Sequence, residues 1–204
     1  MSQQIPCLSY GKPGILAAWL VLMACLPLNA QAAGMVLTGE IAFGGDDLVI
    51  VSGGEDLHAG ELLNLGIGFD FDLNAAKTLL LRTGINYKFT AVEASNGDAY
   101  FDRWPLDLIL VWRQGNASLG AGLTYHLSPS YEIDANGITS EADFDDALGF
   151  LLQAGFMVTP TMELGVRVTM IEYEPSVPLT WWPSGAPIDK VDGDSFGFYV
   201  SVGF

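Results

Sequence analysis

Residues 196–204 read Phe-Gly-Phe-Tyr-Val-Ser-Val-Gly-Phe, with a large apolar side chain at every second position. These apolar positions are Phe196, Phe198, Val200, Val202 and Phe204, and the positions between them are mostly small or polar. Side chains alternate between the two faces of a strand, so this stretch predicts a strand with one apolar and one polar face. We therefore expect the chain to end on an amphipathic β-strand.

The same period of two recurs in eight segments of the chain. They have 9–13 residues, which is long enough for the 9–11 that a tilted strand needs to cross a membrane. The segments are 35–43, 60–71, 77–89, 101–113, 117–127, 147–158, 162–173 and 195–204. The pattern predicts eight consecutive strands, each apolar on one face.

The predicted connections alternate in length. The short ones, 72–76, 114–116 and 159–161, are rich in turn residues. The long ones, 44–59, 90–100, 128–146 and 174–194, are polar. Short turns at one end and long loops at the other are typical of outer-membrane barrels, whose short turns face the periplasm.

The terminal aromatic strand resembles the closing strand of bacterial outer-membrane β-barrels. The eight segments resemble the small members of that class, such as the OmpX-like, OmpW-like and OmpA transmembrane-domain families. The resemblance implies an all-β, eight-stranded antiparallel up-and-down transmembrane barrel in the outer membrane, with its long loops extracellular. It implies contact with outer-membrane lipid and lipopolysaccharide, and reading of the terminal strand by the barrel-assembly machinery. No subfamily motif accompanies it, so no individual activity transfers.

Residues 1–32 have the plan of a secretory signal peptide, with a polar start, an apolar core at 15–24 and a small-x-small site at 30–32. We expect cleavage after Ala32, which leaves 33–204 as one barrel domain. The alternative is a lipobox-like Leu-Met-Ala-Cys at 22–25, where cleavage would leave a lipidated Cys25.

The chain that remains after Ala32 is strongly acidic. It keeps seven Lys and Arg and 24 Asp and Glu residues, a net charge of −17. This balance argues against nucleic-acid binding. Both cysteines precede Ala32, so disulfides and thiolate metal ligands are excluded for the cleaved chain.

The acidic residues concentrate in the long connections. Asp134-Ala135-Asn136-Gly137 and Asp192-Gly193-Asp194 resemble fragments of calcium loops, but neither has the full ligand spacing. We predict no metal site and no cofactor. The acids either form a solvated anionic surface or bind divalent cations that bridge them to lipopolysaccharide.

If the apolar faces meet lipid, the alternate residues point inward. Counted from the short turns, six of them fall at a similar depth: Glu40, Asn64, Arg82, Asp107, Gln153 and Arg167. A buried charge needs a partner, and the interior of eight strands is only wide enough for side chains to fill. We predict that the six form a polar network, which is either a fixed plug or a gate for a small solute.

His126-Leu127-Ser128 superficially resembles the His-x-Ser pair of the outer-membrane lipid A deacylases, with Glu132 or Glu141 as the acid of a triad. The match departs from that family because Pro129 follows the serine and because the alternation points His126 inward. The leading prediction is therefore a non-enzymatic barrel acting in envelope integrity or surface interaction. A narrow channel for ions or small, even hydrophobic, solutes is the alternative, and a lipid A hydrolase is remote.

Overall fold

The computed structural model describes residues 31–49, 57–94, 97–135, 138–176 and 190–204. Within these ranges no helix is long and apolar enough to cross a membrane. The predicted signal peptide up to residue 30, including Cys25, lies outside the described residues, so the cleavage and lipidation predictions stay predictions.

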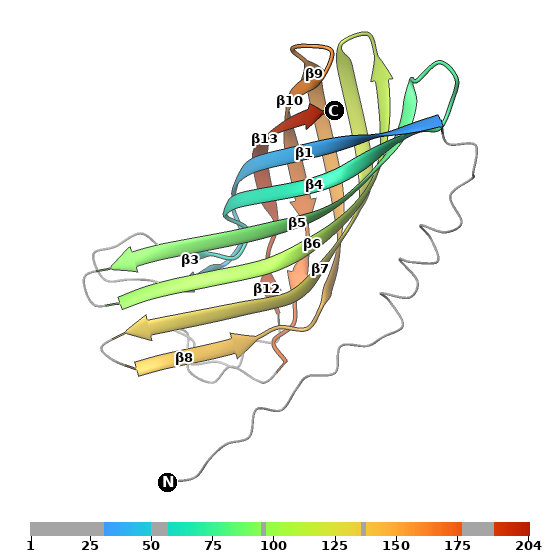
Figure 1. Cartoon of the computed structure of the whole chain (residues 1–204). Coiled ribbons are helices and arrows are strands. Elements are labelled where there is room, and N and C mark those ends of the chain that lie inside the picture. The colour runs from blue at the N-terminus through green and yellow to red at the C-terminus, as the bar shows by residue number, and fades with distance from the viewer. Residues whose placement is uncertain (1–30, 50–56, 95–96, 136–137, 177–189) are drawn as a thin grey trace. The chain divides into compact units, whose positions relative to one another are not determined.

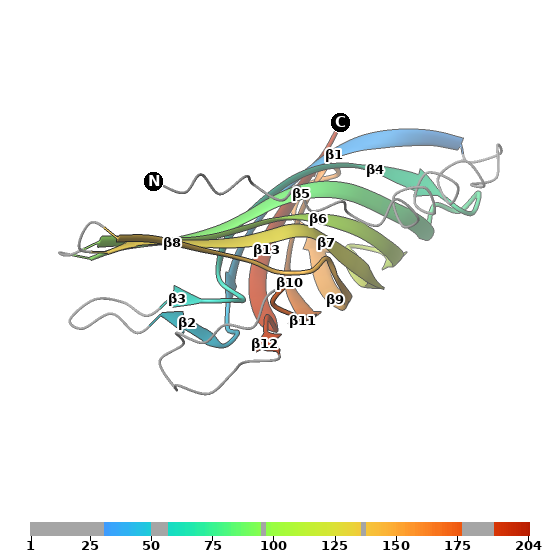
Figure 2. The same cartoon turned by 90° about the horizontal axis from the view of Figure 1, so that it is seen from below.

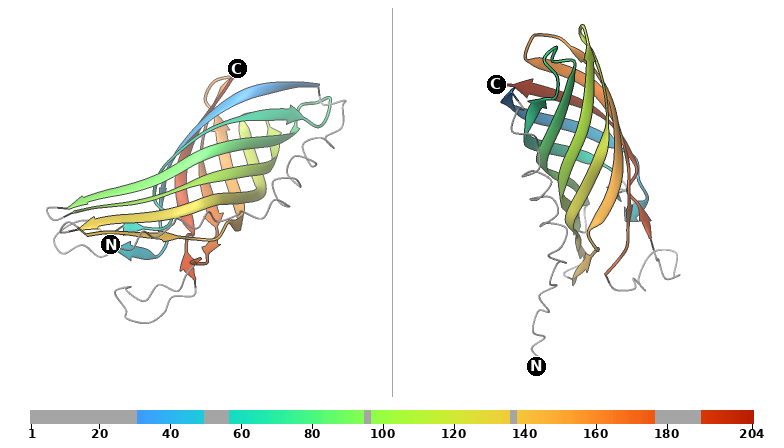
Figure 3. Two further views of the ribbon diagram at one scale, coloured as in Figure 1. Left: turned by 60° about the horizontal axis from the view of Figure 1, so that its bottom comes forward. Right: turned by 90° about the vertical axis from the view of Figure 1, so that its right-hand side faces the viewer.

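Eight long antiparallel strands close into a barrel, as the alternation predicted (Figure 1). Around the barrel they are β1 (Gln31–Phe43), β4 (Leu62–Asp72), β5 (Leu79–Ala94), β6 (Gly97–Gln114), β7 (Ala117–Ala135), β9 (Ala147–Met157), β10 (Met162–Met170) and β13 (Ser195–Gly203). Each strand pairs with the next, and β13 pairs back with β1. Figure 3 shows the tilt of the strands around the barrel. The predicted eight-stranded fold is confirmed.

The terminal strand closes the barrel at the β1–β13 seam. Its register runs from Val36 opposite Gly203 to Phe43 opposite Phe196. The backbone N–H of Phe204 donates to the carbonyl of Met35 at 2.9 Å. The apolar residues 196–202 that the sequence singled out therefore lie in register with both β1 and β10, and Phe204 joins β1 through its backbone.

The two faces of the wall differ as the period of two predicted. Outward residues are large, apolar and exposed, for example Phe150 at 62% and Phe198 at 59%. Inward residues are buried and mostly polar. A wall that is apolar outside and polar inside is the arrangement of a transmembrane barrel.

Two of the predicted long loops are wrong, because strands continue through them. Residues 90–94 extend β5 and 97–100 extend β6. Residues 128–135 extend β7, and of these 130–135 pair with β8 (Ile138–Asp143). Figures 1 and 2 show β5 to β8 running on together as a sheet beyond the other strands. The polar residues that suggested loops occupy one face of this sheet, while apolar residues line the other.

That apolar side of the projecting sheet packs against two short hairpins. One is β2 (Asp47–Val49) with β3 (Leu57–His58), and the other is β11 (Glu172–Tyr173) with β12 (Val191–Asp192). The buried side chains that meet there form what we call the cap cluster: Leu48, Leu57, Ala59, Ala99, Phe101, Tyr131, Ala142, Phe144, Ala147, Ile171, Tyr173 and Val191. Figure 2 shows both hairpins on the same side of the sheet.

A smaller apolar cluster lies inside the barrel wall. It consists of Leu80, Ile109, Val111 and Leu151, none more than 2% exposed. The sequence carries a signal for it in the unbroken apolar run 108–112, since apolar residues at consecutive positions indicate burial on both faces of a strand. The interior is therefore polar on one part of its wall and apolar on another.

Candidate functional site

The inward side chains nearest the short turns form the turn-side cluster of Asp70, Arg82, Arg113 and Glu163. Arg82 donates from Nε and Nη2 to the two carboxylate oxygens of Asp70 at 2.7 and 2.9 Å. The same Nη2 lies 3.4 Å from Glu163 Oε2. Arg113 Nη2 lies 3.2 Å from Asp70 and 3.7 Å from Glu163. Two arginines and two acids thus neutralise one another.

The ion pair of Arg82 with Glu163 spans the barrel, because β5 and β10 lie on opposite walls. Glu163 is fixed by two more donors, the hydroxyls of Ser118 and Tyr199, each 2.6 Å from Oε1. A carboxylate with three hydrogen-bond donors and a second arginine at 3.7 Å, at 1% exposure, has little freedom to move. The side chains of the turn-side cluster therefore extend across the lumen from one wall to the other, and these contacts hold them in place.

The next level toward the loops is the central cluster, built around Arg167. Its members are Glu40, Asn64, Asn86, Asp107, Gln153 and Arg167. Arg167 Nη1 lies 3.0 Å from Glu40 Oε2 and 3.5 Å from Asp107 Oδ2, and Nη2 donates to Gln153 Oε1 at 3.1 Å. The amides of Asn64 and Asn86 each donate to one of the two carboxylates at 3.0 Å.

The structure brings five of the six predicted lumen residues together in this central cluster. The sixth, Arg82, lies in the turn-side cluster, because the β4–β5 register sets it opposite Asp70 while Asn64 lies opposite Lys88. Counting from the turns ignored the stagger between tilted strands. Tyr199 connects the two levels, since its hydroxyl binds Glu163 and its ring centre lies 5.3 Å from Arg167 Cζ.

Sequence reasoning did not assign Asp70 or Tyr199 to the lumen. Asp70 is an inward residue between the outward Phe69 and Phe71, so its place in the alternation could have identified it. Tyr199 is inward for the same reason, in the polar phase of β13.

A third inward set, the loop-side group, contains Lys88, Arg103 and His126. Lys88 Nζ donates to Ser195 Oγ at 3.2 Å, and Arg103 Nη2 donates to the carbonyl of Glu61 at 3.4 Å. The Arg103 guanidinium lies 4.4 Å from the ring centre of Phe101. This group therefore lies directly beneath the cap cluster, of which Phe101 is a member.

The predicted His126–Ser128 pair does not form a catalytic arrangement. His126 is 2% exposed and its Nδ1 lies 2.6 Å from the Tyr173 hydroxyl. Ser128 is exposed and has a φ of 46°, and its backbone N–H donates to Asp146 Oδ1. Glu132 and Glu141 face each other on β7 and β8, outside the lumen. The imidazole is inside the barrel, and the serine and both candidate acids are exposed.

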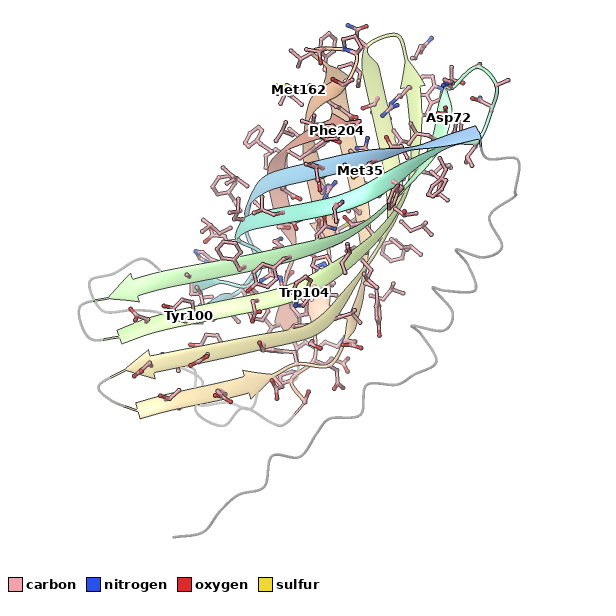
Figure 4. The ribbon with its side chains drawn as sticks, viewed as in Figure 1. Met35, Asp72, Tyr100, Trp104, Met162 and Phe204 are labelled. Atoms are coloured by element: carbon pink, nitrogen blue, oxygen red, sulfur yellow. The ribbon has the colours of Figure 1, made fainter. Side chains whose placement is uncertain are left out.

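The outer surface of the projecting sheet is acidic. We call it the acidic sheet face, and it comprises Asp98, Tyr100, Asp102, Glu132, Asp134, Glu141 and Asp143. Its acids meet directly across strands, Asp98 opposite Asp134 and Glu132 opposite Glu141. Figure 4 shows Tyr100 on the projecting part, with Trp104 between it and the turn end marked by Asp72 and Met162.

The other long connections are acidic too. Burial raises the pKa of the Asp194 carboxyl, and the nearby carboxylates of Asp192 and Glu172 raise it further. The Asp192 carboxylate accepts a hydrogen bond from the Asp194 N–H at 2.7 Å. In the described ranges no three His, Cys, Asp or Glu residues come together in a group that could hold a metal ion. Asn136 and Gly137 of the other calcium-loop fragment lie outside those ranges.

No protein-family model and no curated protein matches the sequence. Solved structures do resemble the fold. That of neisserial surface protein A aligns with a TM-score of 0.52 at 12% identity, covering 84% of this chain and 97% of that one. A major outer membrane protein of Thermus thermophilus aligns at 0.47 and 12% identity, covering 85% and 100%. OprG of Pseudomonas aeruginosa aligns at 0.47 and 15% identity, covering 84% and 95%. The chain has the fold of the small eight-stranded outer-membrane barrels.

Proposed function

We propose that this chain is a non-enzymatic outer-membrane barrel with a sealed lumen, and that its acidic sheet face is an extracellular contact surface for basic partners. The barrel acts as the anchor in this proposal. The like-charged residues paired across β6, β7 and β8 are the single observation that carries it.

Strand length supports the placement of this surface outside the membrane. β6 has 18 residues and β7 has 19, roughly twice the 9–11 that a tilted strand needs to cross the hydrocarbon. The surplus lies entirely at the end away from the short turns. If those turns face the periplasm, as in outer-membrane barrels generally, the acidic sheet face is extracellular.

The charge pattern supports a contact role over a merely soluble surface. Like charges directly opposite each other destabilise a sheet, so a ladder of them has a cost in folding free energy. A basic partner removes that repulsion when it binds. Because the acids are spread in rows along the sheet, we favour an extended basic surface, such as a lysine-rich peptide segment, over a single bound cation.

Neutralising the face tests this proposal. Refolded protein in zwitterionic nanodiscs is titrated with a fluorescent octa-lysine peptide, and Glu132→Gln, Asp134→Asn, Glu141→Gln is compared with wild type. We expect about tenfold weaker binding, since each surface charge contributes roughly 0.2–1 kcal/mol. The control triple variant Asp47→Asn, Glu172→Gln, Glu174→Gln changes the net charge equally at exposed acids of the hairpins. Equal binding by the two triple variants would contradict a role for the sheet.

A measurement with calcium tests the alternative that divalent cations bind the acidic residues. If divalent cations bridge the acids to lipopolysaccharide, millimolar calcium raises the thermal stability of the wild type in lipopolysaccharide nanodiscs and not that of the sheet variant. We expect no such difference.

We propose that the protein does not hydrolyse lipid A, because His126 and Ser128 face different environments. Lipid A from cells overproducing the protein should be unchanged in mass. Deacylated lipid A that disappears in the His126→Ala variant would overturn this part of the proposal.

A further inference from the structure

Two cations face each other inside the barrel beneath the cap cluster. Lys88 on β5 and Arg103 on β6 are register partners and both point inward. Lys88 is 3% exposed and Arg103 is 0% exposed. Ser195, whose hydroxyl accepts a hydrogen bond from Lys88, comes from β13 on the far side of the lumen.

Neither cation has a carboxylate partner among the described residues. The ion pairs found there join the other lumen cations, Arg82, Arg113 and Arg167, to acids. Arg103 has the carbonyl of Glu61 and the faces of Phe101 and Tyr173, and its Nε and Nη1 are buried with no acceptor. A guanidinium does not lose its proton in a protein, so its charge must be compensated where it is.

The charges of the lumen residues indicate the sign of the group that would compensate these two cations. The buried or half-buried cations of the lumen are Arg82, Lys88, Arg103, Arg113 and Arg167. The acids that face them are Glu40, Asp70, Asp107 and Glu163. Counted over these nine residues, four acids against five cations leave one positive charge. The turn-side cluster is neutral, the central cluster has one more acid than cations, and the loop-side group has two cations and no acid.

We propose that one small monovalent anion, of the size of chloride, binds between Lys88 and Arg103. The ammonium, the unpaired guanidinium N–H groups and the Ser195 hydroxyl supply donors for it. The rings of Phe101 and Tyr173 close the site on the loop side, which favours a halide over a larger oxyanion. With one bound anion, the charges of these nine lumen residues sum to zero.

Bromide is the probe for the site, because it is close to chloride in size and is located by anomalous scattering. In crystals of the refolded protein grown in sodium bromide, we expect an anomalous peak between Lys88 Nζ and the Arg103 guanidinium. A bromide-bound crystal with no peak there would overturn the proposal, whatever the variants show.

Thermal stability gives an independent readout in solution. Replacing gluconate by chloride at constant ionic strength should raise the Tm of the wild type along a saturating curve. The rise should be about 5–10 °C if chloride reaches about 100 times its Kd. The Lys88→Met variant should lose this response, while Lys190→Met, which removes an exposed lysine, should keep it. An equal response in both variants would show general salt stabilisation and contradict the site. If Lys88→Met does not refold, the bromide map of the wild type decides.

Discussion

Arg167 is the side chain on which the central cluster depends, since it contacts Glu40, Asp107 and Gln153 at once. Removal of one partner from a buried ion pair leaves an uncompensated charge. We therefore expect Arg167→Met to lower the free energy of unfolding by about 3–5 kcal/mol. Urea unfolding of the refolded barrel in micelles measures this. The double variant Glu40→Gln, Arg167→Met should lose less than the single one, and a larger loss would contradict the proposed pairing.

Gly155 shows how tightly the turn-side cluster is packed. A Cβ atom there would lie 2.3 Å from Glu163 Oε1 and 2.4 Å from the Tyr199 hydroxyl oxygen. We expect Gly155→Ala to cost about 1–3 kcal/mol through overpacking. Gly39→Ala is the matched control, because its Cβ would make only ordinary contacts of 3.6–3.7 Å. Equal unfolding midpoints for the two variants would contradict a closely packed interior.

The sequence predicted which residues point into the lumen better than it predicted how far along the barrel axis each of them lies. The period of two assigned Glu40, Asn64 and Asp107 to the interior, where the structure has them buried. It could not assign Arg82 to its level, because depth depends on the stagger between neighbouring strands. Nor does any periodicity show that Lys88 and Arg103 have no acid beside them, since ion pairing is decided across the lumen by residues far apart in the sequence.

Elements were predicted more accurately at the turn end than at the loop end. The short turns 72–76 and 114–116 end strands close to where the structure ends them. The predicted loops 90–100 and 128–146 failed because their acidic residues suggested solvent, and solvent indeed covers only one face of those strands. Asn96-Gly97 and Asn136-Gly137, strong hairpin signals in the sequence, would have corrected both.

Repulsion between the like-charged pairs of the acidic sheet face should lower the free energy of unfolding by a measurable amount. Glu141→Gln removes one member of the Glu132–Glu141 pair, and we expect the free energy of unfolding to rise by a few tenths of a kcal/mol at low ionic strength. High salt screens exposed charges, so the difference should vanish there. Calorimetric scans at both salt concentrations check this, and a salt-independent effect would contradict an electrostatic origin.

The cap cluster is expected to contribute stability without making the seal. Phe144 is 4% exposed and packs edge-to-face on Phe101 and Tyr173, with ring centres 5.7 and 6.2 Å away. Phe144→Ala should cost about 3–5 kcal/mol in unfolding experiments. The variant should nevertheless stay closed to ions, because the turn-side and central clusters remain.

At the scale of the whole molecule, the charges are sorted by sign. Five of the seven basic residues after Ala32 point into the lumen, while most of the described acids lie at the loop end, on the projecting sheet, on the two hairpins and in the segments beside them. The sequence alone indicated this separation, since the basic residues fall in the strands and the acids concentrate between the predicted strands. It could not distinguish a plug from a gate, because that depends on contacts such as Arg82 with Glu163, which cross the barrel.

Single-channel conductance in planar bilayers tests the sealed lumen most directly. The refolded wild type is compared with the double variant Arg82→Ala, Arg167→Ala, after a gel-shift assay has shown that both are folded. We expect no steady openings in the wild type and openings in the double variant, which loses Arg82 from the turn-side cluster and Arg167 from the central cluster. Steady openings of the wild type that change in the variant would contradict the account and establish a channel gated by these ion pairs.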